Sequence, residues 1–373
     1  MHHLNGTVCN LGERYEALKF MGCGDYGSYI KALDKRTNEF VLIQKVHKIE
    51  NLFDAQKVLR GLRILRLFKH ENIIELRNVI FNQDPKEFGA IFLITNLMEI
   101  DLNVVCKNSK ALTDDHIQFV IYQIVRALLC LHSAGIIHGR LRPLNILASE
   151  TCDIQLSDFG RSRSVFFNSN ENDDENTSDF PSNRYYRAPE ILISREYSTV
   201  VDMWNVGCIM AELITGDTLF RGENYIQEIR SIVETLGKPK DMSFVTSKHA
   251  KKFLDTLSEI PKRPLLSVVR YDNDDALDLL SKLLEIDPRK RITAAEAIVH
   301  PYLRAFHEPT DEPVFTGELD FQFKDEAKLT MEETLLAIVD EVNYWKKQNN
   351  EDEVDKEKFN DFLKSKSSLK DAY

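Results

Sequence analysis

The chain has 373 residues, of which 43% are hydrophobic, and it carries a formal net charge of −11. This length suffices for one bilobal domain or two ordinary domains with a sizeable core. The acidic balance argues against non-specific binding to nucleic acids or anionic membranes, because both need a basic surface, and it favours basic peptides or proteins as partners.

The six cysteines show no C-x-x-C spacing, so neither a zinc site nor a disulfide framework is indicated, and a reducing compartment fits best. No run approaches the roughly 18 apolar residues of a membrane-spanning helix. The N-terminus MHHLNGTVCN also lacks the apolar core of a signal peptide. We therefore expect a soluble intracellular protein, located in the cytoplasm and also in the nucleus.

Residues 15–50 alternate apolar and polar positions around glycines, which predicts three antiparallel strands joined by tight turns. A helix over about 53–69 and two more strands, LRNVIF and AIFLIT, complete a small α+β lobe at 15–97. From the N-cap residue Thr113 onward the period becomes helical, so a second lobe at 98–303 is expected to be mostly helical. The first apolar stripe of that lobe consists of Ile117, Val120, Ile121, Ile124, Leu128 and Leu131.

Other segments lack these periods. Residues 1–14 form an N-terminal arm, and the polar, acidic segment 166–183 is expected to be a mobile loop. A C-terminal extension at 304–373 begins with a Pro- and acid-rich stretch and continues with an amphipathic helix over about 330–347. Its acidic tail, 349–373, is highly charged, and we expect it to be frayed.

Gly22, Gly24 and Gly27 form a G-x-G-x-x-G between two predicted strands, where glycines let backbone amides approach a phosphate, although a plain hairpin also explains them. An ordered series of motifs follows. It consists of Asp158-Phe159-Gly160, Ala188-Pro189-Glu190, Asp202 in DMWNVGC, and Arg291 in DPRKRIT. This order and spacing resembles the eukaryotic protein kinase fold over 15–303. The resemblance implies a bilobal α+β fold with a small β-rich N-lobe and a larger helical C-lobe.

Within that superfamily the chain resembles the MAP kinases, nearest the stress-activated branch, in stretches such as HENII, LTDDHIQFVIYQI, RYYRAPEILI and DMWNVGCIMAELITG. An insert at about 238–269 is also similar to that family. Glu308 and Asp311 in HEPTDEP match its acidic docking groove, although an acid pair near proline is more often solvated surface. The resemblance implies partners in MAP kinase pathways, namely upstream kinases, phosphatases or substrates that bind through basic docking peptides.

Two residues that would clamp the nucleotide in an active kinase are replaced. The V-A-I-K pattern reads Val41-Leu42-Ile43-Gln44, and the neutral amide of Gln44 cannot supply the charge of the lysine that contacts the phosphates. Lys45 is adjacent, but alternation along a strand points it to the opposite face. The helix glutamate that would pair with the lysine falls on Gly61. Both ends of that ion pair are therefore absent.

The catalytic-loop pattern H-R-D-L-K-P-x-N reads HGRLRPLN, beginning at His138. The family's proton-accepting aspartate becomes Arg140, which stays protonated and cannot act as a base. The arginine that reads the activation-loop phosphate becomes Gly139. The T-x-Y phosphorylation signature falls on Ser178, Asp179 and Phe180, and a phenylalanine cannot accept phosphate. The resemblance therefore implies that the phosphorylation switch is lost at both ends.

The adenine pocket is also altered. Tyr29 and Leu42 align with smaller residues that roof the adenine in kinases, so the pocket should be narrowed. The gatekeeper, hinge and floor positions keep ordinary residues, namely Thr95, Met98 and Leu147.

The metal ligands of active kinases remain as Asn145 and Asp158. Asp158 is also explained as the partner of Arg140 in an internal salt bridge. Three further residues have expected architectural roles: Asp202 should brace the His138 loop through backbone amides, and Glu190 and Arg291 should form a buried ion pair, from which removing one partner costs about 3–5 kcal/mol.

The sequence therefore predicts a MAP-kinase-like pseudokinase that serves as a scaffold, decoy or allosteric partner in a MAP kinase cascade. A positioned base contributes about 10²–10⁴-fold to rate, so efficient transfer is not expected. No cofactor is expected, although residual ATP and Mg²⁺ binding stays open. The alternative is a weak or atypical Ser/Thr protein kinase that retains ATP and Mg²⁺ through Asp158 and Asn145, and a relic without a specific partner is a third reading.

Overall fold

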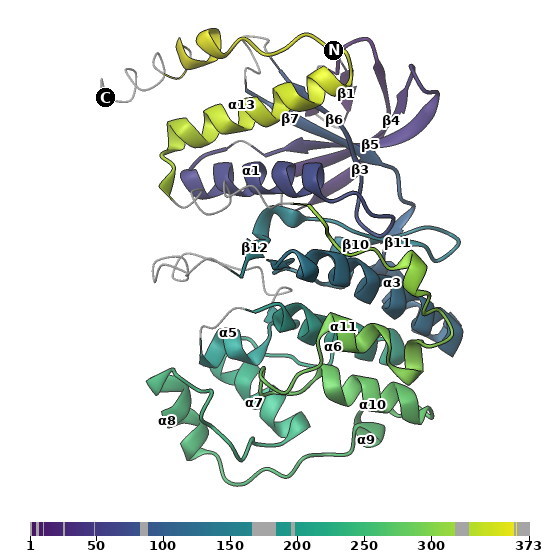
Figure 1. Cartoon of the computed structure of the whole chain (residues 1–373), viewed down its shortest axis with the longest axis vertical. Helices are drawn as coiled ribbons and strands as arrows, with labels where there is room; N and C mark the ends of the chain where they lie inside the picture. Colours follow the sequence, from purple (N-terminus) through teal and green to yellow (C-terminus); the bar gives the residue numbers. More distant parts are fainter. Residues whose placement is uncertain are drawn as a thin grey trace. The chain divides into compact units, whose positions relative to one another are not determined.

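The structure is a computed structural model that describes residues 2–4, 7–9, 11–24, 27–47, 49–82, 89–165, 184–194, 198–317, 328–361 and 363. The chain forms two compact units, each continuous in space but not in sequence. The first unit comprises 1–69, 74–98 and 320–373, and the second comprises 70–73 and 99–319. Figure 1 shows β-sheet and two long helices in the first unit and mainly helices in the second, which is the predicted α+β class.

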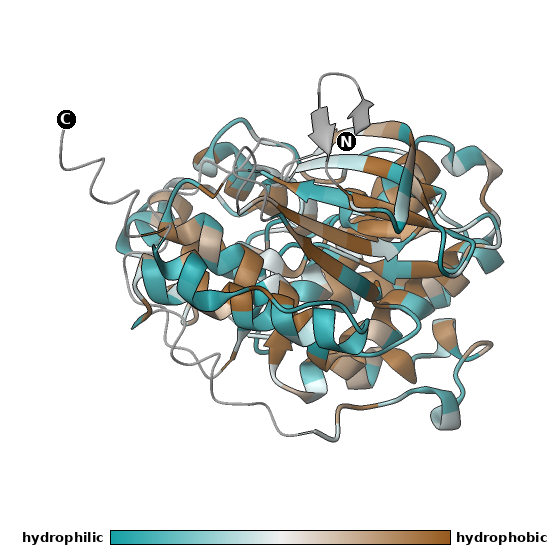
Figure 2. Ribbon diagram, turned by 90° about the horizontal axis from the view of Figure 1, so that it is seen from above, coloured by the Kyte–Doolittle hydropathy of each residue, from teal (hydrophilic) through white to brown (hydrophobic). Residues whose placement is uncertain are grey.

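The first unit is built on a five-stranded antiparallel sheet of order β3-β4-β5-β7-β6. Its strands are β3 (Tyr15–Gly24), β4 (Gly27–Asp34), β5 (Glu39–Val46), β6 (Leu76–Phe81) and β7 (Ile91–Asn96), which confirms the predicted strands. A two-stranded hairpin of β1 (His2–Leu4) and β2 (Thr7–Cys9) precedes them. The central strands are mainly hydrophobic (Figure 2). Their alternate residues, such as Ile30, Val41 and Ile43, are fully buried on one face of the sheet.

Two helices complete the first unit. Helix α1 (Leu52–Leu67) packs against α13 (Met331–Gln348), and α13 also packs against β6 (Figure 1). Thr330 caps α13 with a capping box, as its sequence predicts. The shared core takes Leu59 and Leu62 from α1 and Ile338, Val339 and Val342 from α13.

The prediction that 349–373 would be frayed is wrong for its described part. Residues 356–361 are helical, and Val354 and Phe359 are 4% and 3% exposed within the same core as α1 and α13. The Phe359 ring meets that of Phe81 edge to face, with centroids 5.3 Å apart. Asn343 and Val354 exchange two hydrogen bonds of 2.7 and 3.1 Å. Apolar residues within a charged sequence thus help to anchor the tail.

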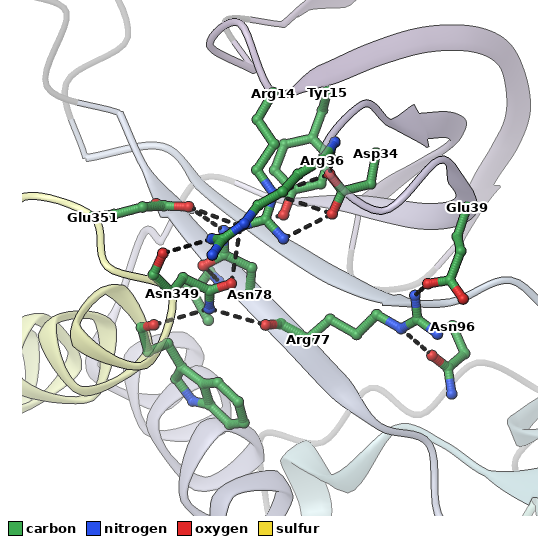
Figure 3. Close-up of polar contacts among 12 residues, drawn as sticks. Arg14, Tyr15, Asp34, Arg36, Glu39, Arg77, Asn78, Asn96, Asn349 and Glu351 are labelled. Carbon is green, nitrogen blue, oxygen red and sulfur yellow. Dashed lines mark hydrogen bonds and ion pairs between the residues drawn. The ribbon is translucent and has the colours of Figure 1, made fainter.

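A polar network fastens the same tail to the sheet (Figure 3). The Arg14 guanidinium donates to Asp34 at 2.7 Å, to Asn349 at 2.9 Å and to Glu351 at 3.0 Å. Asn78 on β6 donates to Glu351 at 2.8 Å. Because charge-assisted hydrogen bonds to a single arginine join β4 to the tail, the tail is an integral part of this unit.

The second unit is mainly helical and contains two small antiparallel sheets, β11-β10-β8 and β12-β9. Its helices are α2 (Leu102–Lys107), α3 (Asp114–Ser133), α5 (Pro189–Ile193), α6 (Val200–Thr215), α7 (Tyr225–Leu236), α8 (Lys248–Thr256), α9 (Leu265–Val269), α10 (Asp274–Leu283) and α11 (Ala294–Ile298). The short strands are β8 (Ile100–Asp101), β9 (Ile136–Ile137), β10 (Ile146–Ala148), β11 (Ile154–Leu156) and β12 (Arg163–Ser164).

Helix α3 begins after the predicted cap Thr113, and all six residues of its predicted apolar stripe are buried. Helix α6 is buried on nearly every side and packs against α3 and α10, so it forms the centre of this unit. Among the described residues, no helix combines the length and apolar character needed to cross a bilayer.

Candidate nucleotide and phosphoryl-transfer site

The glycine motif lies where β3 turns into β4, and Gly24 pairs with Gly27 across the two strands. Gly27 has a φ of +155°, and a Cβ on it would fall 1.9 Å from the Lys45 carbonyl oxygen on β5. Only glycine allows β4 to approach β5 this closely. The sheet itself therefore accounts for Gly27. Gly22 lies on β3, paired with Tyr29, and the two residues between Gly24 and Gly27 fall outside the described part of the chain.

The ring of Tyr29 lies against the backbone of Gly24. A Cβ on Gly24 would be 2.8 Å from the Tyr29 Cε2 atom and 3.4 Å from its hydroxyl oxygen. Gly24 thus makes room for an aromatic ring of the same protein. The ring thus occupies space directly beside the β3–β4 hairpin, and the narrowing of an adenine pocket by Tyr29 stays a prediction.

The strand β5 presents Leu42 and Gln44 on one face of the sheet. Gln44 pairs with Tyr29 on β4, and Leu42 pairs with the gatekeeper residue Thr95 on β7. Lys45 lies on the opposite face, where its Nζ is 5.6 Å from the ring centroid of Phe92. The register therefore places Lys45 on the face opposite to Leu42 and Gln44, as alternation along the strand predicts.

Gly61 lies within α1 and provides no side chain for an ion pair. The charged contacts of α1 go instead to Glu341 on α13, whose carboxylate is 3.2 Å from Arg66 and 3.7 Å from Arg63. Glu341 is 3% exposed, and burial raises its pKa despite both arginines. Sequence reasoning missed this residue, although its position within the apolar stripe Ile338–Trp345 signals a carboxylate that needs a partner.

In the second unit, the catalytic-type loop is held by Asp202 on α6. Its carboxylate accepts hydrogen bonds from the backbone N–H of His138 at 2.8 Å and of Gly139 at 2.9 Å. His132 lies 2.9 Å from the same carboxylate, and Asp202 is fully buried. The predicted brace is present. Burial also lowers the pKa of His138, so this histidine is neutral and fills a structural position.

Arg140 and Asp158 form the predicted ion pair, with Arg140 Nη1 2.9 Å from Asp158 Oδ2. The Asn145 amide also donates to Asp158 Oδ2, at 2.9 Å, and to the Arg140 carbonyl oxygen, at 2.8 Å. The Arg140 and Asp158 side chains are 8% and 13% exposed. Arg140 is therefore a buried cation that cannot lose its proton, held by the carboxylate of Asp158.

These residues do not fit Mg²⁺. The ion requires oxygen ligands in near-octahedral arrangement, but Asp158 Oδ2 already accepts two N–H groups. The bond to the Arg140 carbonyl fixes the Asn145 amide with its nitrogen, not its oxygen, toward Asp158. A guanidinium 2.9 Å from the carboxylate also repels a second cation. No cluster of three or more His, Cys, Asp or Glu side chains suited to a metal occurs among the described residues.

Glu190 and Arg291 form a bidentate ion pair with nitrogen to oxygen distances of 2.5 and 2.8 Å. The two side chains are 1% and 0% exposed. Arg291 also donates to the carbonyl oxygens of Val200 and Glu285, each at 2.9 Å, and stands 5.1 Å from the ring of Trp204. The predicted pair is thus present, and each of the three guanidinium nitrogens donates at least one hydrogen bond, which suits an architectural role.

Comparison with known proteins shows the family to which the chain belongs. A model of the protein kinase domain matches residues 15–303. Mitogen-activated protein kinase p38b of Drosophila melanogaster is 38% identical over 351 residues, which are 92% of this chain and 93% of the relative. The chain belongs to the mitogen-activated protein kinase family.

Two further relatives have similar coverage. Mitogen-activated protein kinase 14 of Xenopus laevis is 40% identical over 83% of this chain and 85% of the relative. Mitogen-activated protein kinase 5 of Arabidopsis thaliana is 34% identical over 92% of this chain and 91% of the relative.

The remaining predicted site residues of this MAP kinase family member belong to different units or fall outside the described residues. Met98 is the last residue of its segment in the first unit, whereas Leu147 lies on β10 of the second, paired with Asp101 and Gln155. Both are half-buried. The activation-loop residues Ser178, Asp179 and Phe180 fall outside the described residues, as does the whole segment 166–183.

The predicted docking acids are exposed, and each has a contact within its own unit. Glu308 accepts hydrogen bonds from Thr310, at 2.8 Å from the hydroxyl, and these bonds hold the pKa of Glu308 below its usual value. Asp311 pairs with Arg126 at 2.8 Å while remaining 63% exposed.

Arg126 also pairs with Glu71 at 3.0 Å, and Glu71 is 77% exposed. Sequence reasoning missed both Arg126 and Glu71. An arginine on the buried face of α3 was the available signal, because a buried cation requires carboxylates nearby.

Proposed function

We propose that this MAP kinase family member is a pseudokinase, in which the fold is used for protein contacts and efficient phosphoryl transfer is lost. The observation that carries the proposal is the contact between Arg140 Nη1 and Asp158 Oδ2 at 2.9 Å. Arg140 thereby takes the place of the base and also pairs with the Asp158 carboxylate that would hold the metal.

Phosphoryl transfer in kinases depends on positioning and charge neutralisation, and active kinases turn over at about 1–100 per second. Without a base, worth about 10²–10⁴-fold, on the order of 10⁻⁴ to 1 per second would remain. The neutral Gln44 and the ring of Tyr29 beside Gly24 lower this further, although such losses do not simply add. The chain's own residues therefore favour a nucleotide site that is weak or absent.

A thermal-shift titration with ATP and Mg²⁺ tests this part. A ligand at 100 times its Kd stabilises a fold by about 2.7 kcal/mol, whereas we expect no shift here. The competing function is a weak Ser/Thr kinase that retains ATP and Mg²⁺ through Asn145 and Asp158, and it is kept open by the presence of both residues at the family's metal-ligand positions. A clear shift that Asp158→Ala abolishes would favour that alternative and contradict the expectation that the nucleotide site is weak or absent.

The second part of the proposal is the role of the fold as a scaffold, decoy or allosteric partner in a MAP kinase cascade, in the cytoplasm and nucleus. The similarity to a relative named p38b supports placement in the stress-activated branch. The exposed carboxylates of Glu308, Asp311 and Glu71 form an acidic surface in the second unit, which suits basic docking peptides of upstream kinases, phosphatases or substrates.

Fluorescence anisotropy with a labelled Arg- and Lys-containing docking peptide tests this role. We expect Glu308→Gln combined with Asp311→Asn to weaken binding about twofold to thirtyfold, because two exposed charge pairs at about 0.2–1 kcal/mol each are lost. The matched control is Asp255→Asn with Glu259→Gln, which removes the same charge from exposed positions in the same unit. Equal weakening by both variants, or no binding by the wild type, would remove the support for docking.

A further inference from the structure

The insert at 238–269 has a charge opposite to that of the rest of the chain. It contains seven Lys and Arg residues against three Asp and Glu, a net charge of +4, so the other 341 residues carry −15. Six of the seven cations are exposed. None of these six forms an ion pair with a residue in the described part of the chain. They are Lys240, Lys248, Lys251, Lys252, Lys262 and Arg263.

Three of these cations, Lys248, Lys251 and Lys252, lie on α8 and define what we call the lysine face. Their spacing of three and four residues places them on one side of the helix. The opposite side carries Ala250 and Leu254, which are 0% and 2% exposed. The helix is therefore anchored through its apolar side, and the lysines are directed to solvent.

The start of α8 is fixed to the rest of the second unit. The backbone N–H of Ser247 donates to the carbonyl oxygen of Ile193 at 2.9 Å, and the Thr246 hydroxyl donates to that of Ser194 at 2.8 Å. Ser247 caps the helix by accepting from the Ala250 N–H at 3.3 Å. A surface held at these points loses little conformational freedom when it binds a partner.

The lysines are placed where they weaken the helix. All three are within the first five residues of α8, and its first turn contains no acidic residue. The N-terminal end of a helix carries a partial positive charge, so cations there are unfavourable. The three like charges also repel one another, and among the described residues no carboxylate forms an ion pair with them. Their arrangement is unfavourable for the isolated chain and becomes favourable when an external anion lies on the lysine face.

We propose that the lysine face binds an Asp- and Glu-rich segment of a partner protein. The positive charge of the lysine face favours an anionic partner. The net charge of −15 on the rest of the chain disfavours a large one. An extended polyanion such as duplex DNA or an anionic bilayer would also face that negative charge. A short acidic segment meets only the lysine face, since screening limits the interaction to about 8 Å at physiological ionic strength. The proposal is independent of Arg140 and of the docking acids, so it can fail while they hold.

The test is fluorescence anisotropy of a fluorescein-labelled peptide of alternating Glu and Asp with the full chain, at low and at physiological salt. We expect K248E/K251E/K252E to weaken binding between about threefold and about 150-fold at low salt, from three exposed charge contacts. The control K69E/K107E/K110E makes the same change in net charge at exposed lysines elsewhere and should weaken binding far less.

Folding of the variants is checked by urea unfolding. The midpoint of K248E/K251E/K252E should equal or exceed that of the wild type, because acids at a helix N-terminus are favourable. Wild-type protein that does not bind the peptide, or equal losses in test and control variants, would overturn the proposal. Tighter binding to phosphatidylserine vesicles or duplex DNA than to the peptide would overturn it as well.

Discussion

The buried pair of Glu190 and Arg291 offers a quantitative test of the second unit. In Glu190→Gln the guanidinium keeps its charge in a site that is 0% exposed and loses its only carboxylate among the described residues. Breaking a buried pair in this way costs about 3–5 kcal/mol. The carbonyl oxygens of Val200 and Glu285 remain as acceptors, so we expect the lower end, about 3 kcal/mol.

Replacing both partners should cost much less than the two single changes together. Glu190→Leu with Arg291→Met leaves no charge in the site, and apolar replacements of buried pairs range from neutral to stabilising by about 1–4 kcal/mol. Here the carbonyls of Val200 and Glu285 would lose their donor, so we expect a net loss of about 1–2 kcal/mol. A double-mutant cycle that uses Glu190→Leu and Arg291→Met as its two single variants should therefore show a coupling of about 2 kcal/mol or more between the two positions.

The two tryptophans of the chain make the assay specific, because Trp204 lies in the second unit and Trp345 in the first. Urea unfolding followed by Trp204 fluorescence in a Trp345→Phe background reports the unit that contains the pair. A loss below about 1 kcal/mol for Glu190→Gln, or additive single and double variants, would refute the reasoning that the pair is architectural.

Three more predictions concern particular residues. Burial and the neighbouring Arg126 lower the pKa of His70 from 6.5 to about 4. The contribution of neutral His70 to the free energy of unfolding is therefore complete above pH 6.5 and is lost as the pH falls toward 4. Urea unfolding of the wild type should show that the free energy of unfolding falls by on the order of 2 kcal/mol between pH 6.5 and pH 4. This fall should be absent in His70→Asn, which keeps an acceptor for the Asn72 N–H. Equal pH profiles of the two proteins would contradict this. Phe359→Ala should lower the free energy of unfolding reported by Trp345 fluorescence by about 3 kcal/mol or less, because a terminal segment can detach. The value reported by Trp204 should not change. The control is the exposed substitution Lys358→Ala. Tyr29→Val should not create ATP affinity by itself, since Gln44 still lacks a charge, and a thermal shift in that single variant would show that the ring alone blocks the site.

Much of the fold follows from local patterns in the sequence. The strands of the first unit and the helix after Thr113 have strong periods, clear caps and turn glycines, and the structure has them at the expected places. The ion pair between Arg140 and Asp158 was also predictable, because a buried cation requires a carboxylate and the family order of motifs brings these two residues together.

Contacts between distant segments were not predictable in the same way. The tail after 349 is dominated by charge, and only its contact with Phe81 shows that Val354 and Phe359 belong to a core. Glu341 and Arg126 have partners that are remote in the sequence, and a single sequence cannot show which carboxylate forms an ion pair with which arginine. The glycine motif invites a phosphate-binding reading, whereas packing of Gly27 on β5 and of Tyr29 on Gly24 explains two of its members without a ligand.

The central claim is that Arg140 occupies the position of the base and engages Asp158, so that the chain does not transfer phosphate efficiently. Its most direct test is incorporation of ³²P from γ-labelled ATP, with Mg²⁺, into a basic protein substrate, comparing purified wild type with Asp158→Ala. The account predicts equal incorporation by the two proteins, at the level of a blank without protein. Incorporation that rises with wild-type concentration and disappears in Asp158→Ala would contradict it.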